Sequence, residues 1–205
     1  MSVLLLVRHA VTDQTGKRLY GRTPGIAISE EGRGQAEVLA GHMAPVRLAA
    51  LYSSPLQRCL ETAETLAAAR GLSPEVTEDL NEIDYGDWAG RTFASLGRMR
   101  AWTSLRRRPS AASFPGGETL VAAQARSVRA VEGIAARHPR GVVAVVTHGD
   151  VIRLSLAHFA GVHLDLYQRL EVSPASVSVL RLGRGGPRVV RMNDTGTLDG
   201  VAVGG

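Results

Sequence analysis

The sequence predicts an α/β fold with strands of the buried, parallel type. Three short apolar runs, residues 3–7, 48–53 and 142–146, have the length and composition of strands inside a parallel sheet. A segment with helical spacing of apolar residues follows each run, directly or after a loop. Because open α/β sheets bind ligands beyond the carboxyl ends of their strands, the polar residues that end these runs are the first candidates for a functional site.

Length and composition limit the possible architectures. The chain has 205 residues, 44% hydrophobic and 21% charged, which suits a single domain, or one domain with a lid, around a substantial core. No run of about 18 apolar residues is present, so no membrane span is expected. Residues 4–7 are too few for a signal-peptide core, and Cys59 is the single cysteine, which excludes an internal disulfide and a cysteine zinc cluster. We therefore expect a cytoplasmic protein.

The charge balance favours anionic partners. The net charge is +5, and Lys17 is the only lysine among the basic residues. Nucleic-acid binding is one interpretation of this charge, but the arginines are scattered and aromatic residues make up only 4% of the chain, which leaves few platforms for base stacking. We interpret the charge as favouring small anionic substrates, with no nucleic-acid partner.

The first apolar run ends at Arg8 and His9. An arginine binds phosphate oxygens through two parallel hydrogen bonds, and a histidine nitrogen can attack phosphorus, so the pair suits phosphate chemistry. Two solvated polar residues at a strand edge are the alternative. A loop rich in turn-forming residues then leads to Ser29, which can cap a helix that reaches about residue 43.

The second run is followed by Ser54-Pro55, a favoured start for a helix. Arg58 lies in the first turn of that helix, off the apolar stripe. A cation near a helix amino end and just beyond a strand is a natural anion site, although a solvated arginine is the simpler interpretation.

A segment rich in acids, aromatics and glycines, residues 79–90, is predicted to be a structured loop, and it contains Glu82, Asp84 and Asp87. Periodicity is weak from residue 91 to 115, where five arginines cluster: Arg98, Arg100, Arg106, Arg107 and Arg108. This stretch is a candidate lid, and solvated loop charge is the default explanation of its arginines.

The third run repeats the arrangement of strand, polar tip and helix. A long helix reaching about residue 137 precedes it, Thr147-His148-Gly149 ends it, and a helix to about residue 160 follows. Alternating residues at 176–182 and 188–193 predict a terminal hairpin, and residues 195–205 a flexible tail. The remaining histidines are expected to be structural or solvated: His42, His138, His158 and His163.

Four ordered signals together resemble the histidine phosphatase superfamily, the phosphoglycerate mutase-like proteins. They are Arg8-His9 on the first strand, Arg58 after Ser53-Ser54-Pro55, Glu82 before Tyr85-Gly86, and Thr147-His148-Gly149 after a late strand. The resemblance covers roughly residues 3 to 160, including a Gly116-Gly117-Glu118 turn.

The resemblance implies a three-layer sandwich, with a mostly parallel central sheet, helices on both faces and a lid inserted at about residues 85–118. It implies that His9 is the phosphorylated nucleophile and Glu82 the proton donor, with Asp84 and Asp87 as local rivals to Glu82. The phosphate would be surrounded by Arg8, Arg58 and His148. The pocket would be lined by Thr12, Gly21, Arg22 and Gly149.

The expected activity is that of a phosphatase that hydrolyses small phosphate monoesters without a metal or cofactor, as a monomer or homodimer. Two permanently charged arginines can neutralise the equatorial phosphate oxygens, and a carboxyl group beside a phosphate has a raised pKa that suits a proton donor. A phosphomutase of the same fold is the alternative, and a non-catalytic phosphate-binding module is a remote one. The chain departs from common family patterns at Ala10, Val11 and Thr15, and Phe93 stands where the glycolytic mutases have a lysine, which favours hydrolysis.

Overall fold

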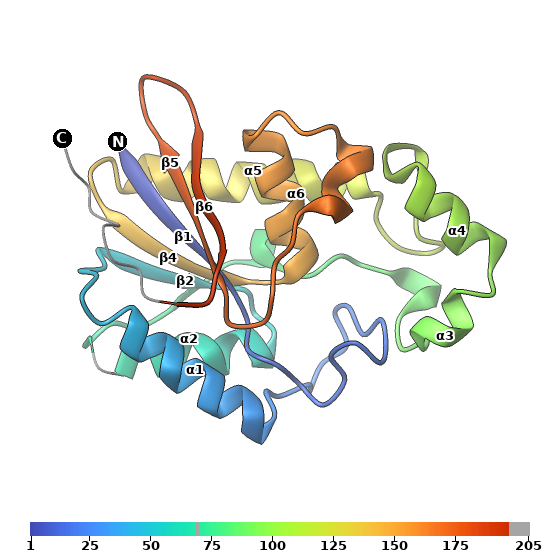
Figure 1. The fold of residues 1–205 in the computed structure, drawn as a ribbon, viewed down its shortest axis with the longest axis horizontal. Coiled ribbons are helices and arrows are strands. Elements are labelled where there is room, and N and C mark those ends of the chain that lie inside the picture. Colours follow the sequence, from blue (N-terminus) through green and yellow to red (C-terminus); the bar gives the residue numbers. More distant parts are fainter. Residues whose placement is uncertain (69, 197–205) are drawn as a thin grey trace.

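The computed structural model describes residues 1–68 and 70–196, which form an α/β fold around one six-stranded sheet (Figure 1). The strand order is β3-β2-β4-β1-β5-β6, with β1, β2, β3 and β4 parallel and β5 and β6 antiparallel to their neighbours. The strands span Ser2–Arg8 (β1), Ala50–Ser53 (β2), Glu75–Val76 (β3), Val142–Thr147 (β4), Val177–Leu182 (β5) and Arg188–Asp194 (β6). The predicted mostly parallel sheet and the terminal hairpin are confirmed.

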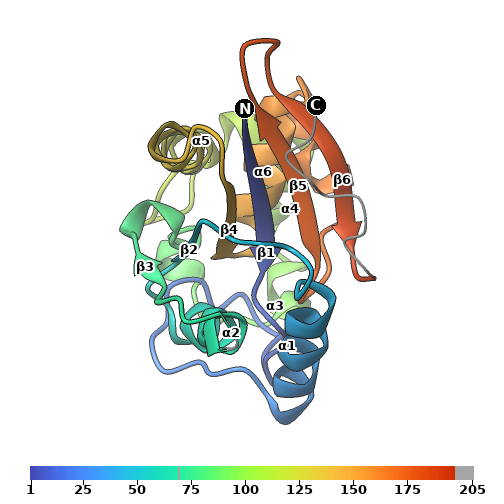
Figure 2. The same cartoon turned by 90° about the vertical axis from the view of Figure 1, so that its left-hand side faces the viewer.

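Helices cover both faces of this sheet, as predicted. They span Glu30–His42 (α1), Gln57–Ala68 (α2), Phe93–Leu96 (α3), Arg100–Arg107 (α4), Leu120–Arg137 (α5) and Gly149–Phe159 (α6). Helices α1 and α2 pack on one face and α5 and α6 on the other (Figure 2). Successive side chains of a strand point to opposite faces, so β1 contributes Val3, Leu5 and Val7 to the first layer and Leu4 and Leu6 to the second.

One helix boundary differs from the prediction. Helix α2 begins at Gln57 rather than at Ser54-Pro55. The Ser54 amide donates to the carbonyl of Val146 at 3.0 Å, which extends the pairing of β2 with β4, and the Ser54 hydroxyl contacts His148. Ser54 therefore belongs to the strand end, and the chain needs a turn before the helix can start.

The predicted lid segment, residues 85–118, holds the short helices α3 and α4 and lies beside the sheet (Figure 1). Its aromatic and leucine side chains form a separate core with α6: Trp88, Leu96, Leu105 and Phe114 pack with Leu154 and Ala157. This tertiary packing orders a segment whose sequence periodicity is weak. That this segment acts as a lid stays a prediction.

The described part of the chain ends at residue 196, just after β6 at the antiparallel edge of the sheet. Of the predicted flexible tail, residues 195 and 196 are described, and 197–205 lie outside the described residues. Within the described ranges, no helix is both long enough and apolar enough to cross a membrane.

Candidate active site

The candidate site lies where β1 and β4 end side by side. Arg8 pairs with Thr147 in the sheet register, and the His9 amide donates to the Thr147 carbonyl at 2.9 Å. His9 and His148, which directly follow the ends of β1 and β4, therefore lie close together. The rings of His9 and His148 lie with their centroids 5.3 Å apart at an interplanar angle of 64°.

His9 is held in a single orientation. It is 2% exposed, and its Nδ1 lies 2.7 Å from the carbonyl oxygen of Ala10. A carbonyl only accepts, so Nδ1 carries the proton, and the lone pair of the neutral ring is on Nε2. Burial and the charges of Arg58 and Arg8 hold the pKa of His9 well below its usual value. The neutral form required of a nucleophile is therefore favoured.

Arg58 is fully buried at the start of α2 and has unused donors. Its Nη2 donates to the Gly21 carbonyl at 2.7 Å and lies 3.2 Å from Nδ1 of His148. Its guanidinium carbon lies 4.7 Å from the centroid of the Tyr20 ring. Nε and Nη1 have no hydrogen-bond partner. Because buried charged donors are costly to leave unpaired, these N–H groups are suited to bind an anion.

Arg8 supplies a third unpaired buried donor. Its Nη1 donates to the Val172 carbonyl at 2.6 Å, while its Nε is buried without a partner. Burial, together with the charge of Arg153, lowers the pKa of Arg8. Gly149 lies directly beside the guanidinium, and a Cβ at this glycine would be 3.1 Å from Nε. The glycine therefore leaves room for the arginine at the amino end of α6.

His148 is fully buried between β4 and α2. Its Nε2 lies 2.7 Å from the Ser54 hydroxyl, and its Nδ1 faces Arg58 and lies 3.8 Å from Oε2 of Glu82. Burial and the charge of Arg58 hold the pKa of His148 well below its usual value. A neutral ring accepts from Arg58 at Nδ1 and donates from Nε2 to Ser54. The arrangement gives each ring nitrogen a defined partner.

Glu82 is a buried carboxyl group with a shifted pKa. Its Oε1 accepts from the Ile83 amide at 2.9 Å, which fixes the side chain. Burial and then the charge of Asp150 raise its pKa to about 7, against the opposing effect of Arg58. The group can therefore both donate and accept a proton near neutral pH.

A network outside the cavity holds the Glu82 loop in place. Arg126 donates to the carbonyls of Asp79, Asn81 and Glu82 at 2.9, 2.6 and 3.0 Å, and to both carboxylate oxygens of Glu118 at 2.7 and 3.0 Å. Arg22 donates to the Glu82 carbonyl at 2.8 Å and to Glu118 at 3.1 Å. Glu118 also accepts from the Asp84 amide at 2.9 Å.

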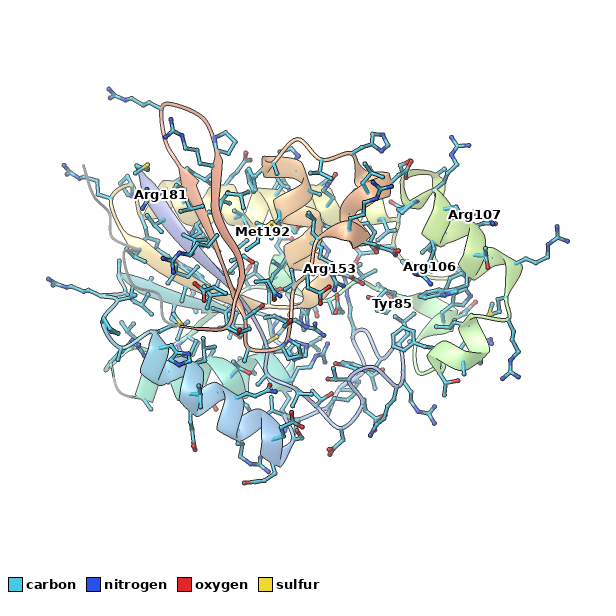
Figure 3. All side chains as sticks on the ribbon, in the orientation of Figure 1. Tyr85, Arg106, Arg107, Arg153, Arg181 and Met192 are labelled. Atoms are coloured by element: carbon cyan, nitrogen blue, oxygen red, sulfur yellow. The ribbon has the colours of Figure 1, made fainter. Side chains whose placement is uncertain are left out.

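These groups open into a cavity of about 560 Å³ that reaches the lid segment. Its floor includes Arg8, His9 and Glu82, and Arg58 and His148 are buried behind it. Asp150 and Arg153 of α6 form one wall, and Arg106 of α4 faces them (Figure 3). The Tyr85 hydroxyl donates to Asp150 at 3.0 Å, and Arg153 pairs with the other oxygen of Asp150 at 3.0 Å.

The structure brings together His9, Arg8, Arg58, Glu82 and His148, as the sequence analysis expected. Two of the four residues expected to line the pocket do so, and two do not. Gly21 and Gly149 line the cavity, whereas Thr12 and Arg22 do not.

Thr12 and Arg22 are directed elsewhere by their hydrogen bonds. The Thr12 hydroxyl lies 3.0 Å from that of Thr15 and accepts from the Gln14 amide. Arg22 is directed to Glu82 and Glu118 as described above. Both residues therefore shape the loops around the cavity rather than its surface.

The acidic rivals of Glu82 stay outside the cavity. Asp84 accepts from the Gly86 amide at 3.0 Å, and neither it nor Asp87 is among the cavity residues. Asp150 was missed by the sequence analysis, although its place two residues after His148, in the first turn of a helix, was an available signal. Arg126 was missed because its acceptors are mostly backbone carbonyls, which leave no local pattern.

The arrangement suits a tetrahedral dianion. Three buried, unpaired guanidinium nitrogens of Arg8 and Arg58 lie around a neutral histidine, with a protonatable carboxyl group nearby. Among the described residues, no group of three or more histidine, cysteine, aspartate or glutamate side chains is placed to hold a metal ion.

Comparisons with known proteins identify relatives across almost the whole chain. Phosphoserine phosphatase 1 of Hydrogenobacter thermophilus is 30% identical over 200 residues, which cover 95% of this chain and 93% of that protein. A Mycobacterium tuberculosis protein described as bifunctional is 34% identical over 202 residues, and the chain spans only 54% of its length.

Solved structures also superpose on almost the whole chain. Bacillus stearothermophilus YhfR superposes with a TM-score of 0.89 at 31% identity, covering 95% of this chain and 98% of that one. The mycobacterial glucosyl-3-phosphoglycerate phosphatase has a TM-score of 0.83 at 28% identity, with 93% and 98% covered. The sequence profile of the histidine phosphatase superfamily (branch 1) matches residues 4–195. This chain belongs to the histidine phosphatase superfamily.

Proposed function

We propose that the protein is a phosphatase that hydrolyses small phosphate monoesters through a phosphohistidine at His9. The observation that carries the proposal is the set of three unpaired, buried guanidinium nitrogens of Arg8 and Arg58 beside a histidine whose Nε2 bears its lone pair. An equatorial phosphate oxygen satisfies such donors without a metal ion. The relatives named phosphoserine phosphatase and glucosyl-3-phosphoglycerate phosphatase support hydrolysis.

In the first step, Nε2 of His9 attacks phosphorus and the bond from phosphorus to the ester oxygen breaks. The protonated Glu82 carboxyl group gives its proton to the departing oxygen, so an alcohol leaves rather than an alkoxide. Arg8 and Arg58 hold the equatorial oxygens during transfer. The Ala10 carbonyl accepts from Nδ1 and stabilises the positive charge that forms on the ring.

In the second step, water attacks the phosphorus and the nitrogen–phosphorus bond breaks. Glu82, now a carboxylate, accepts the proton of the water, and inorganic phosphate leaves. The enzyme returns to its starting protonation state. His148 accepts from Arg58 at Nδ1 and so orients this guanidinium. We propose that the reaction takes place in the cytoplasm, on a small ester, by a monomer or homodimer.

The proposal is tested by His9→Ala, with His158→Ala as the matched control on the exposed side of α6. Turnover of p-nitrophenyl phosphate should be lost in the first variant and kept in the second, with or without chelator. Wild-type protein quenched during turnover should carry an acid-labile phosphate on His9. Unchanged turnover in His9→Ala would refute the mechanism.

The mutase alternative gives a different result in the same experiment. A mutase retains its phosphoenzyme when no acceptor alcohol is present, because it excludes water from the phosphohistidine. A phosphatase releases one inorganic phosphate per ester and its phosphoenzyme decays within a turnover. A phosphoenzyme that survives many turnover times without hydrolysis would assign the chain to the mutases.

A further inference from the structure

The cavity is larger than a phosphate group requires. At about 560 Å³ it lies within the roughly 300–1,000 Å³ range of sites that enclose a whole small molecule. The phosphate donors occupy only its floor. The outer part must therefore hold the leaving group of the ester, and its chemistry describes that group.

One wall of the outer cavity is aromatic. Phe93 and Trp102 have ring centroids 6.2 Å apart and both line the cavity, as do Tyr85 and Phe114, whose centroids are 4.9 Å apart. Phe93 is 38% exposed, a large apolar surface left open at the cavity. Aromatic faces of this kind favour a flat or apolar ring over a small polar chain.

The mouth of the cavity also holds a cation without an acidic partner. Of the five lid arginines, only Arg106 lines the cavity. Tyr85 and Arg153 line the same cavity (Figure 3). Arg153 is paired with Asp150 at 3.0 Å. Among residues 1–68 and 70–196, no carboxylate pairs with Arg106.

The acids of the cavity do not offset this charge. Asp150 is engaged by Tyr85 and Arg153 together, and the carboxyl group of Glu82 is buried on the floor. Arg18, a second arginine at the mouth, donates to the Gly90 carbonyl, a neutral group. The outer cavity therefore carries excess positive charge beyond the phosphate site.

Resting on the proposed phosphatase function, we infer that the leaving group of the substrate combines an aromatic or apolar ring with a second anionic group. The ring lies against Phe93 and Trp102, and the anion is bound by Arg106. Arg106 acts on substrate selection and takes no part in phosphoryl transfer.

The test compares three esters. 4-Carboxyphenyl phosphate carries a ring and a second anion, 4-carbamoylphenyl phosphate is its uncharged analogue of the same shape, and glycerol phosphate lacks the ring. The ratio of kcat/KM for the carboxylate to that for the carboxamide measures recognition of the anion alone. Wild-type protein should favour the carboxylate.

Arg106→Gln should lower this ratio by about threefold to fivefold, the range of an exposed ion pair. Arg107→Gln, on the same helix but outside the cavity, is the matched control and should leave it unchanged. Phe93→Ala should lower kcat/KM for both aromatic esters by about threefold relative to glycerol phosphate. Melting temperatures report whether any variant is misfolded.

A ratio that stays the same in Arg106→Gln as in Arg107→Gln would overturn the assignment of the anion. A loss in Phe93→Ala that is equal for all three esters would overturn the assignment of the ring. The variant His9→Ala separates these results from the proposed function. If His9→Ala loses turnover of all three esters, the phosphatase proposal stands, even if Arg106→Gln does not change the ratio of kcat/KM.

Discussion

The substitution Arg126→Met tests whether the network behind Glu82 stabilises the protein and its site. Arg126 is 9% exposed and makes five hydrogen bonds, three to backbone carbonyls and two to Glu118. Methionine fills similar space but donates to neither the Asp79 nor the Asn81 carbonyl. It also leaves the Glu82 carbonyl and the Glu118 carboxylate with Arg22 as their only guanidinium donor. Removing one partner of a buried ion pair costs about 3–5 kcal/mol.

The expected loss is large against the total stability of a domain, roughly 5–15 kcal/mol. At about 2–4 °C per kcal/mol for a chain of this size, the melting temperature should fall by about 6–20 °C. Urea unfolding of the wild type, Arg126→Met and Arg129→Met measures the change in the free energy of unfolding. Arg129 is exposed on the same helix and should change it by less than about 0.5 kcal/mol.

Two further readouts separate the network from general packing. Glu118→Gln combined with Arg126→Met should be less destabilising than the sum of the single changes, because the double variant leaves no buried carboxylate unpaired. In folded Arg126→Met protein kcat should fall, since the Glu82 carbonyl loses one of its two guanidinium donors. A free energy of unfolding within about 1 kcal/mol of wild type would refute the reasoning.

The same network predicts a pH dependence of stability. Burial acts to raise the pKa of Glu118, but hydrogen bonds from Arg126 and the Asp84 amide outweigh it and the pKa is lowered. A carboxyl group with a lowered pKa in the folded state stabilises the protein above its unfolded pKa, and this stability is lost as pH falls through the folded pKa. Wild type should therefore lose more stability on acidification than Arg126→Met does.

Two other substitutions address the cavity itself. Asp150→Asn removes a charge that raises the pKa of Glu82, so the fall in kcat on the alkaline side, where the donor loses its proton, should move to lower pH. Gly149→Ala places a Cβ 3.1 Å from Nε of Arg8 and should raise KM and weaken inhibition by inorganic phosphate. Gly34→Ala, where nothing lies within 4 Å, is the control for both and should add about 0.5–1 kcal/mol of stability without moving the pH profile. An unmoved alkaline limb in the first variant, or unchanged phosphate inhibition in the second, would contradict these assignments.

Much of the fold follows from local patterns. The apolar runs that became β1 and β4 are bounded by polar residues, and their burial matches the prediction. Strand β3 was not predicted, because Glu75 and Val76 are both exposed and only their pairing with β2 makes them a strand. The lid helices were missed for a related reason. Their order comes from aromatic packing with α6, which no short sequence window contains.

The candidate site divides in the same way. Residues at strand ends and helix starts, such as His9 and His148, could be placed together because parallel strands end at one edge of the sheet. Arg126 could not, since its carbonyl acceptors lie 44 to 47 residues earlier in the chain. The groups that carry the proposed chemistry could therefore be named from the sequence, whereas Arg126, which holds the Glu82 loop, could not.

The charges around the cavity favour the dianionic phosphate of the proposed substrate. Burial, with Arg58 and Arg8, keeps His9 neutral, and Arg58 also opposes the protonation of Glu82. A bound phosphate dianion offsets the charge of both arginines and adds its own repulsion to the carboxylate, so it raises the pKa of Glu82 further. Burial, the largest cause of the lowered pKa of His9, persists when phosphate is bound. In the proposed mechanism, substrate binding is thereby coupled to proton uptake at Glu82, the residue that next donates a proton to the leaving group.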